Sequence, residues 1–384
     1  MGKRNDLITV ICFLLVIAFF SAAFIIMPDR ERSEQENRPL AQIPELTADS
    51  LFSGQLSNEI NVYYADQMPF RAELMGVRST LDYLLCRGET GGVLIGKDGQ
   101  LAVRYFDAYK SILLQTEDTD FYYKDSVIAQ ADALSSWAKS SGLEVYTVIP
   151  PRTVDVAVSN LVYTPKIRDE LYGILSERLD SAGYIDLLPI MTARYDNGEY
   201  VYYKTDHHWT TYGAYLAYIE IMKAMGCKQS IVPMEDFAVE QIPDFYGTTD
   251  AKSLLPFTKA DTLELWTLGD EAEYTVIADG EDIGGFYSRA HLDTRDKYAV
   301  FLDGTHGVVT VTKNGESRKK LLVAKDSFAD CLIPFLAREF DIVAVNMESA
   351  TSLTALAEYY GCDTILIVYN AENVVTNGTL GKIR

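Results

Sequence analysis

The chain has 384 residues, and 48% of them are hydrophobic, so it can bury a substantial core. Its formal net charge is -21 at pH 7, which argues against nucleic acid as a partner because the phosphates would be repelled. The five cysteines are scattered without a CxxC pair, a pattern typical neither of a disulfide framework nor of a zinc site.

An apolar stretch at residues 7–27 opens the chain, broken only by one threonine and one serine. As a helix rising about 1.5 Å per residue, it would just cross a bilayer core of about 30 Å. Lys3 and Arg4 precede it, which places the N-terminus on the cytoplasmic side. We therefore expect residues 1–28 to be an uncleaved signal anchor, with a cleaved signal peptide as the alternative. The protein would be a single-pass protein of the cell membrane whose C-terminal domain is extracellular.

The segment after this stretch, residues 29–50, is polar and includes two prolines, which is typical of a tether. Residues 51–86 have a helical pattern with a break at Pro69. Two apolar strand patterns around an Asp-Gly turn predict a β-hairpin at residues 93–103. We assign residues 51–384 to one domain.

From residue 124 onward, helix and strand patterns alternate. Helices are predicted at 124–141, 166–182, 210–225, 328–340 and 352–360, and strands at 143–149, 184–187, 320–324, 342–345 and 364–368. Such alternation predicts an α/β fold with a parallel sheet and helices on both faces. Residues 231–312 interrupt it with short strand patterns, and we interpret them as a β-rich insertion that carries no chemistry of its own.

Two of the four histidines lie side by side next to an acid, in Asp206-His207-His208. In an extended segment, residues two apart share a side, so Asp206 and His208 would face one way and His207 the other. A carboxylate beside an imidazole fixes its tautomer and stabilises its charged form, which is the supporting half of a hydrolase triad.

A nucleophile for this pair is predicted at Ser327, directly after the strand at 320–324 and at the start of a helix. In open α/β sheets, ligands bind at the carboxyl ends of the strands. The helix start would also offer free N–H groups and a positive dipole end to an oxyanion. The alternative is that Ser327, with Asp330 three residues later, is only a helix N-cap. The presence of Asp206 and His208 favours the nucleophile.

Two other interpretations of the histidine motif remain. It could be an inert pair beside a capped helix, or it could bind metal, as the Asp-His-His signature does in the DHH phosphoesterases. Metal sites of that kind need further acids and another histidine, and only His291 and His306 remain, both in the insertion. We therefore predict no bound metal and no other cofactor.

The run Asp206-His207-His208-Trp209 resembles the motif that names the DHHW family of bacterial envelope proteins. That family is similar to the alginate O-acetyltransferases of the SGNH-hydrolase superfamily. Other motifs carry the same resemblance: residues 36–40, 66–71, 96–99, 149–152 and 245–248. The resemblance implies an SGNH-hydrolase-like, flavodoxin-like fold.

In the alginate enzymes, the acid and histidine of an Asp-x-His-Trp motif pair with a later serine. The resemblance therefore implies a catalytic triad of Asp206, His208 and Ser327. Lys325 stands where the family usually has glycine, and Gly247 and Gly304 are the candidate oxyanion residues.

The expected function is a membrane-anchored, extracytoplasmic O-acetyltransferase or esterase that acts on a cell-surface polysaccharide. The resemblance implies that a multi-pass membrane acyltransferase supplies the acetyl groups. Substrate contacts are expected from Tyr203, His207, Trp209 and Lys325, with the aromatic rings stacking on sugars. The alternative is a catalytically inactive glycan-binding or scaffold protein of the envelope, which Lys325 and the unassigned oxyanion residues favour.

Overall fold

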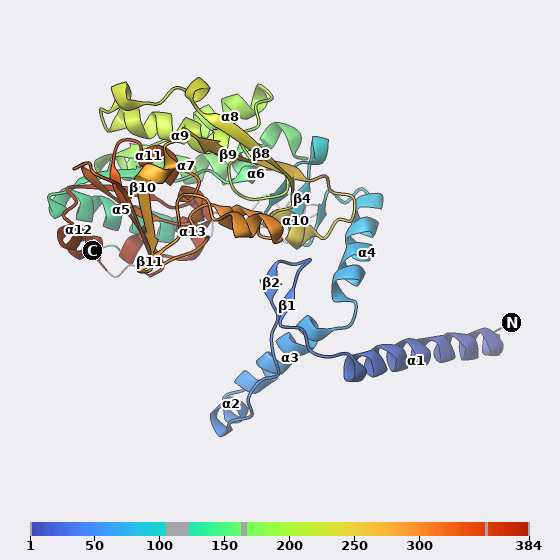
Figure 1. Cartoon of the computed structure of the whole chain (residues 1–384). Coiled ribbons are helices and arrows are strands. Elements are labelled where there is room, and N and C mark those ends of the chain that lie inside the picture. The colour runs from blue at the N-terminus through green and yellow to red at the C-terminus, as the bar shows by residue number, and fades with distance from the viewer. Residues whose placement is uncertain (1, 105–122, 163–166, 350–351, 383–384) are drawn as a thin grey trace. The chain divides into compact units, whose positions relative to one another are not determined.

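The computed structural model describes residues 2–104, 123–162, 167–349 and 352–382 (Figure 1). The chain forms two compact units. Unit 1 comprises residues 1–87 and 251–257, and unit 2 comprises residues 88–250 and 258–384. The assignment of residues 51–384 to one domain stays a prediction.

Unit 1 begins with α1 (Gly2–Ile26), the apolar helix expected from the sequence. Within it, Asn5–Ile26 has a mean hydropathy of 2.9, and none of this span is buried in the structure. By length and composition this helix can cross a membrane, either as an anchor or as a signal sequence.

The segment predicted to be a tether is folded against the rest of unit 1. It contains the antiparallel strands β1 (Arg32–Ser33) and β2 (Arg38–Pro39). The guanidinium of Arg38 forms an ion pair with Asp66, 2.6 Å away. The helices that follow are α2 (Ala48–Phe52), α3 (Gln55–Gln67) and α4 (Arg71–Leu84). The break between α3 and α4 lies at Pro69, as predicted, because proline has no N–H to continue the helix.

Among the described residues, the core of unit 2 is an eight-stranded sheet of order β11-β10-β12-β14-β13-β15-β6-β7. Its strands in chain order are β6 (Glu144–Val148), β7 (Tyr184–Ile185), β10 (Tyr274–Ala278), β11 (Glu281–Asp282), β12 (Val308–Lys313), β13 (Lys320–Lys325), β14 (Asp341–Asn346) and β15 (Thr364–Val368). Strands β14, β13, β15, β6 and β7 are parallel, whereas β12, β10 and β11 are antiparallel additions. Unit 2 is thus a mixed α/β fold with a large mixed sheet. The five strands predicted from the alternation with helices are parallel, as expected, and the antiparallel strands that join them were not expected in this sheet.

The three antiparallel strands come from the stretch interpreted as an insertion. They extend the main sheet because β12 pairs with β14, from Val308 opposite Val345 to Val311 opposite Ile342. A second pair from the same stretch, β8 (Ala238–Phe245) with β9 (Asp261–Thr267), forms a separate sheet. The predicted hairpin at 93–103 is confirmed as β4 (Val93–Ile95) with β5 (Leu101–Val103), joined by β3 (Glu89–Thr90).

Most predicted helices of unit 2 are confirmed. The confirmed helices are α5 (Lys124–Ser141), α7 (Arg168–Arg178), α9 (Thr211–Ala224) and α12 (Leu353–Tyr360). Three short helices of unit 2 were not predicted, namely α6 (Thr153–Val156), α8 (Leu188–Asp196) and α13 (Ala371–Thr376), and α10 (Thr248–Ser253) contains residues of both units. Lys166, the predicted start of one helix, lies outside the described residues. The helix predicted at 328–340 is reduced to a single 3-10 turn, η9 (Ser327–Ala329), and α11 (Ile333–Leu336). Pro334 stands at the beginning of α11, so a helix from residue 328 cannot run through it without losing a hydrogen bond.

Candidate active site

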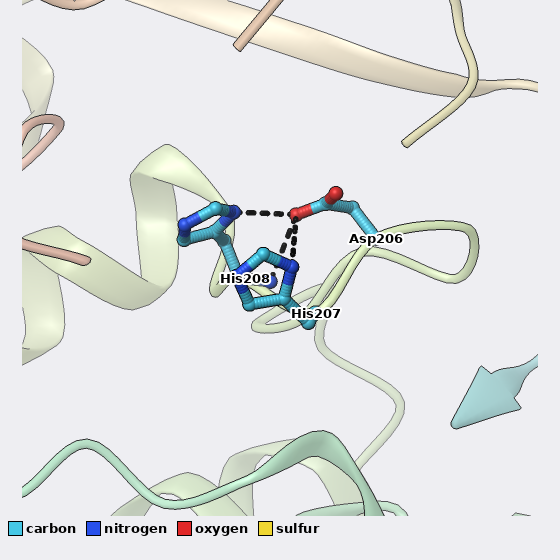
Figure 2. A group of neighbouring side chains, drawn as sticks. All are labelled: Asp206, His207 and His208. Atoms are coloured by element: carbon cyan, nitrogen blue, oxygen red, sulfur yellow. Dashed lines mark hydrogen bonds and ion pairs between the residues drawn. The ribbon is translucent and has the colours of Figure 1, made fainter. Parts of the chain in front are cut away.

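The Asp-His-His motif lies at the tip of a tight turn. Tyr202 and Trp209 form an antiparallel bridge that closes the turn. At the tip, Asp206 Oδ1 accepts the backbone N–H of His208 at 2.9 Å, which bends the chain in the manner of an Asx turn. Since the segment is not extended, His207 does not face away, and its ring centroid lies 3.8 Å from that of His208 (Figure 2).

The Asp206 carboxylate is buried and accepts four hydrogen bonds. Oδ1 binds the N–H of His208 and, at 2.6 Å, its ring Nδ1. Oδ2 binds the N–H of Thr248 at 2.8 Å and its hydroxyl at 3.0 Å. Burial by itself favours the neutral acid, but the charges of His207 and His208 and these hydrogen bonds lower the pKa of Asp206 well below its usual value. Asp206 is therefore an oriented carboxylate.

Glycine at position 247 allows this acid to be enclosed. A Cβ atom on Gly247 would lie 2.2 Å from Cβ of Asp206, which no side chain can occupy. The N–H of Gly247 is already donated to the hydroxyl of Thr205 at 3.2 Å. The N–H of Gly304, the other oxyanion candidate from the sequence, is donated to Phe301 at 3.1 Å. Both candidates are therefore engaged elsewhere in this structure.

Ser327 follows β13 and meets the histidine turn from the other side. His208 Nε2 lies 2.7 Å from Ser327 Oγ, across 119 residues of sequence. The cap of η9 is Asp326, whose side chain accepts the N–H of Phe328 at 3.0 Å, so the Ser327 hydroxyl is not the N-cap. Because η9 has only three residues, the expected contribution of a helix dipole to an oxyanion is absent here.

The hydrogen bonds assign the proton positions. Since Nδ1 of His208 donates to Asp206, Nε2 has a lone pair that accepts the Ser327 hydroxyl proton. Thr248 gives its only hydroxyl proton to Asp206, so its oxygen accepts from Nδ1 of His207 at 2.6 Å. Burial, together with the charge of His208, lowers the pKa of His207 to about 4, so His207 is neutral near pH 7.

Two further side chains hold the serine and histidine in place. The Tyr298 ring is stacked on the His208 ring, with centroids 3.9 Å apart and planes at 7°, and its hydroxyl donates to the Ser327 carbonyl at 3.3 Å. The indole N–H of Trp209 donates to the Phe328 carbonyl at 3.0 Å. Each residue therefore links the histidine turn directly to the serine loop.

Sequence reasoning missed Thr248 and Tyr298. Both lie in residues 231–312, which were interpreted as free of chemistry, and that interpretation is wrong because both contact the Asp206–His208 pair. One signal was present: Thr248 closes the 245–248 motif that carries the family resemblance.

Three of the four residues expected to contact substrate are buried. Tyr203, Trp209 and Lys325 are 1%, 0% and 2% exposed, so their side chains face the protein interior. Lys325 Nζ forms an ion pair with Asp330 Oδ1 at 2.5 Å, which explains how a lysine is accommodated there. Of the four, only His207 retains an accessible side chain, 26% exposed.

Asp206, His207 and His208 offer ligand atoms that lie within 4.8 Å of one another, a grouping that could hold a metal ion. The separation of Asp206 Oδ1 and His208 Nδ1 is 2.6 Å. Two ligands of a tetrahedral zinc ion, each about 2.1 Å from the metal, would lie about 3.4 Å apart. As arranged, this pair shares a proton, and a metal would require it to separate.

Comparison with solved structures gives several matches. A DHHW family protein from Eubacterium siraeum is 18% identical with a TM-score of 0.57, covering 76% of this chain and 95% of that one. PatB1 from Bacillus cereus, solved with a sulfonyl adduct, is 19% identical with a TM-score of 0.60, covering 75% and 97%. The O-acetyltransferase domain of Pseudomonas putida AlgJ is 15% identical with a TM-score of 0.44, covering 74% and 92%.

At these identities the first two likenesses show a shared fold. No curated protein matches the sequence. The model of the DHHW protein family matches residues 106–346, which is more than half of the chain and includes the histidine turn and Ser327. The chain therefore belongs to the DHHW protein family.

Proposed function

We propose that this protein is a membrane-anchored, extracytoplasmic O-acetyltransferase or esterase that acts on a cell-surface polysaccharide through Ser327, His208 and Asp206. The observation that carries the proposal is one continuous hydrogen-bonded line. His208 lies 2.7 Å from the Ser327 hydroxyl on one side and 2.6 Å from the Asp206 carboxylate on the other. Geometry of this kind defines a triad regardless of the order of its members in the chain.

The order of the parallel strands supports an SGNH-like assignment. Across the sheet the parallel strands lie in the order β14-β13-β15-β6-β7. If β13, which leads into Ser327, is counted as strand 1 and β14, β15, β6 and β7 as strands 2 to 5, this order is 2-1-3-4-5. This is the flavodoxin-like order, with the chain entering the sheet at β6 instead of β13. The altered entry point accounts for a serine that follows the aspartate and histidine in sequence.

The reaction begins when His208 Nε2 takes the proton of Ser327 as Oγ attacks the carbonyl carbon of an acetyl ester. The imidazolium, stabilised by Asp206, then gives that proton to the departing alcohol, which leaves an acetyl group on Oγ. In the second half, His208 removes a proton from a sugar hydroxyl or from water, whose oxygen attacks the acetyl-enzyme. Ser327 recovers its proton, and the product is an acetylated sugar or acetate.

The proposed acetyl donor is an ester delivered by a multi-pass membrane acyltransferase, which would lie beside α1 in the bilayer. The burial of Tyr203, Trp209 and Lys325 leaves the sugar contacts to other side chains, among which His207 is partly exposed at the site. The N–H groups of Gly247 and Gly304 are donated to other acceptors, so neither is free to bind an oxyanion. For this reason a non-catalytic glycan-binding protein is the second candidate.

An activity-based probe tests the proposal. PatB1 has been solved with a sulfonyl adduct, so a sulfonyl fluoride is the reagent of choice. We expect it to modify Ser327 and to block acetate release from a chromogenic ester, and Ser327→Ala to lower that release by about 10³-fold or more. The control is Ser349→Ala, which removes an exposed hydroxyl on unit 2 and should change neither result.

Labelling and turnover that persist in Ser327→Ala would eliminate the triad. A parent protein that takes no label but binds polysaccharide would support the non-catalytic candidate. Mass spectrometry of an oligosaccharide incubated with an acetyl donor separates a transferase, which leaves acetyl on the sugar, from an esterase.

A further inference from the structure

Helix α4 exposes an apolar stripe. Leu74, Val77, Leu81 and Leu84 are spaced three, four and three residues apart, so at about 100° per residue they occupy an arc of about 80°. Their exposed fractions are 44%, 59%, 53% and 67%. A stripe of this kind normally faces a core or another apolar phase.

The opposite face of α4 is the one that packs within unit 1, and it is partly polar. The hydroxyl of Ser79 donates to the carbonyl of Ser253 at 2.5 Å. The Tyr83 ring packs against Phe257 with centroids 4.7 Å apart. An ordinary surface helix packs its apolar face against the protein and exposes its polar face. In α4 the most apolar face is instead turned away from the rest of unit 1.

The beginning of α4 is in contact with α1. The rings of Phe70, which precedes α4, and Phe19 are stacked with centroids 6.2 Å apart. Phe24 of α1 contacts Tyr64 of α3, 4.9 Å between centroids. Phe19 lies seven residues before Ile26, about 10 Å along the helix from the end of the apolar span. If α1 spans the bilayer, its partner Phe70 lies at the depth of the outer acyl chains.

We infer that α4 lies on the outer surface of the membrane with its apolar stripe in the acyl-chain region. This inference rests on α1 being the anchor of the proposed function. Arg78 beside the stripe and Arg87 just beyond α4 pair with Asp82 at 3.8 and 3.0 Å, and their side chains are 74% and 56% exposed. Their outward N–H groups can therefore reach lipid phosphates while the leucines enter the bilayer. Residues 71–84 precede the match to the family model, so this surface is a feature of the chain outside that match.

The occupant is lipid because the stripe continues from a residue that touches the membrane-spanning helix. A protein partner or unit 2 covering the stripe would give a different result in the following test. The full-length chain is placed in nanodiscs, and tryptophan is introduced at Leu81, three turns from the contact with α1. Its added emission is measured over that of the three native tryptophans, with and without acyl-chain-brominated lipid.

Two companion variants make the test decisive. Tyr83→Trp stands on the opposite face of the same helix, and Val16→Trp lies within α1. We expect brominated lipid to remove the added emission of Leu81→Trp and Val16→Trp but not that of Tyr83→Trp.

Loss at Val16 with none at Leu81 would overturn the membrane placement of α4 and leave the anchor intact. Loss at neither position would overturn both, and equal loss at Leu81 and Tyr83 would overturn the orientation. Sulfonyl labelling of Ser327 in the same preparations reports separately on the proposed chemistry, since none of the three substitutions touches that site.

Discussion

Replacing Gly247 by alanine tests whether Asp206 must occupy its observed position. The new Cβ would lie 2.2 Å from Asp206 Cβ and 2.3 Å from its Oδ2. The backbone of Gly247 has a negative φ, so alanine itself causes no conformational strain, and the steric conflict is the whole perturbation.

The size of the effect follows from this conflict. Ordinary contacts to a Cβ begin at 3.4 Å, so Asp206 or the turn at Gly247 must yield by about 1.2 Å. A misplacement of about 1 Å in a catalytic group costs about 10²-fold in rate. Removing the acid's function altogether would cost about 10⁴-fold, which sets the upper limit. Overpacking at this site should also lower the free energy of unfolding by about 1–3 kcal/mol.

The measurements are the rate of sulfonyl labelling at Ser327, the release of acetate from a chromogenic ester, and the melting temperature. Gly173→Ala is the matched control because it lies within α7, where an added Cβ has no atom within 4 Å. Gly173→Ala should keep full activity. Its free energy of unfolding should rise by about 0.5–1 kcal/mol because alanine loses less conformational entropy than glycine on folding. Full activity in Gly247→Ala would refute the need for a tightly enclosed carboxylate.

Three further outcomes are expected. Tyr298→Leu should lose about two- to tenfold more activity than Tyr298→Phe, which keeps the ring stacked on His208, and equal rates would argue against the stack. The pKa of His207 is about 4 against a usual 6.5, so between these values the unfolded chain binds more protons. The contribution of His207 to the free energy of unfolding is therefore fully present above pH 6.5. It falls by up to about 3 kcal/mol on acidification to pH 4, and denaturant titrations of His207→Gln should show a smaller loss. Lys325→Met should lower the free energy of unfolding by about 3–5 kcal/mol because it leaves Asp330 unpaired. The double variant Lys325→Met with Asp330→Leu should recover most of this loss, and equal stability of the single and double variants would contradict the prediction.

Local patterns in the sequence were sufficient for several features. The apolar stretch of α1, the proline break before α4, and the positions of β13, β14 and β15 all follow from the order of apolar and polar residues along short segments. The choice of Asp206, His208 and Ser327 as the residues of interest also came from local motifs. No local motif shows whether these residues meet in space, because 119 residues separate His208 from Ser327.

Other features depended on contacts that no local pattern encodes. The edge of β14 could accept β12 in antiparallel orientation, and pairing of that kind is decided by which strand edge is available in the folded sheet. Thr248 reaches Asp206 across 42 residues, and Tyr298 reaches His208 from a stretch with no recognisable motif. The burial of Trp209 and Lys325 likewise follows from what packs over them. The sequence by itself determined which residues could perform acyl chemistry and which helix could cross a membrane. Only the tertiary structure decided their distances, their hydrogen-bond partners and their exposure, because these depend on packing between segments that are distant in the chain.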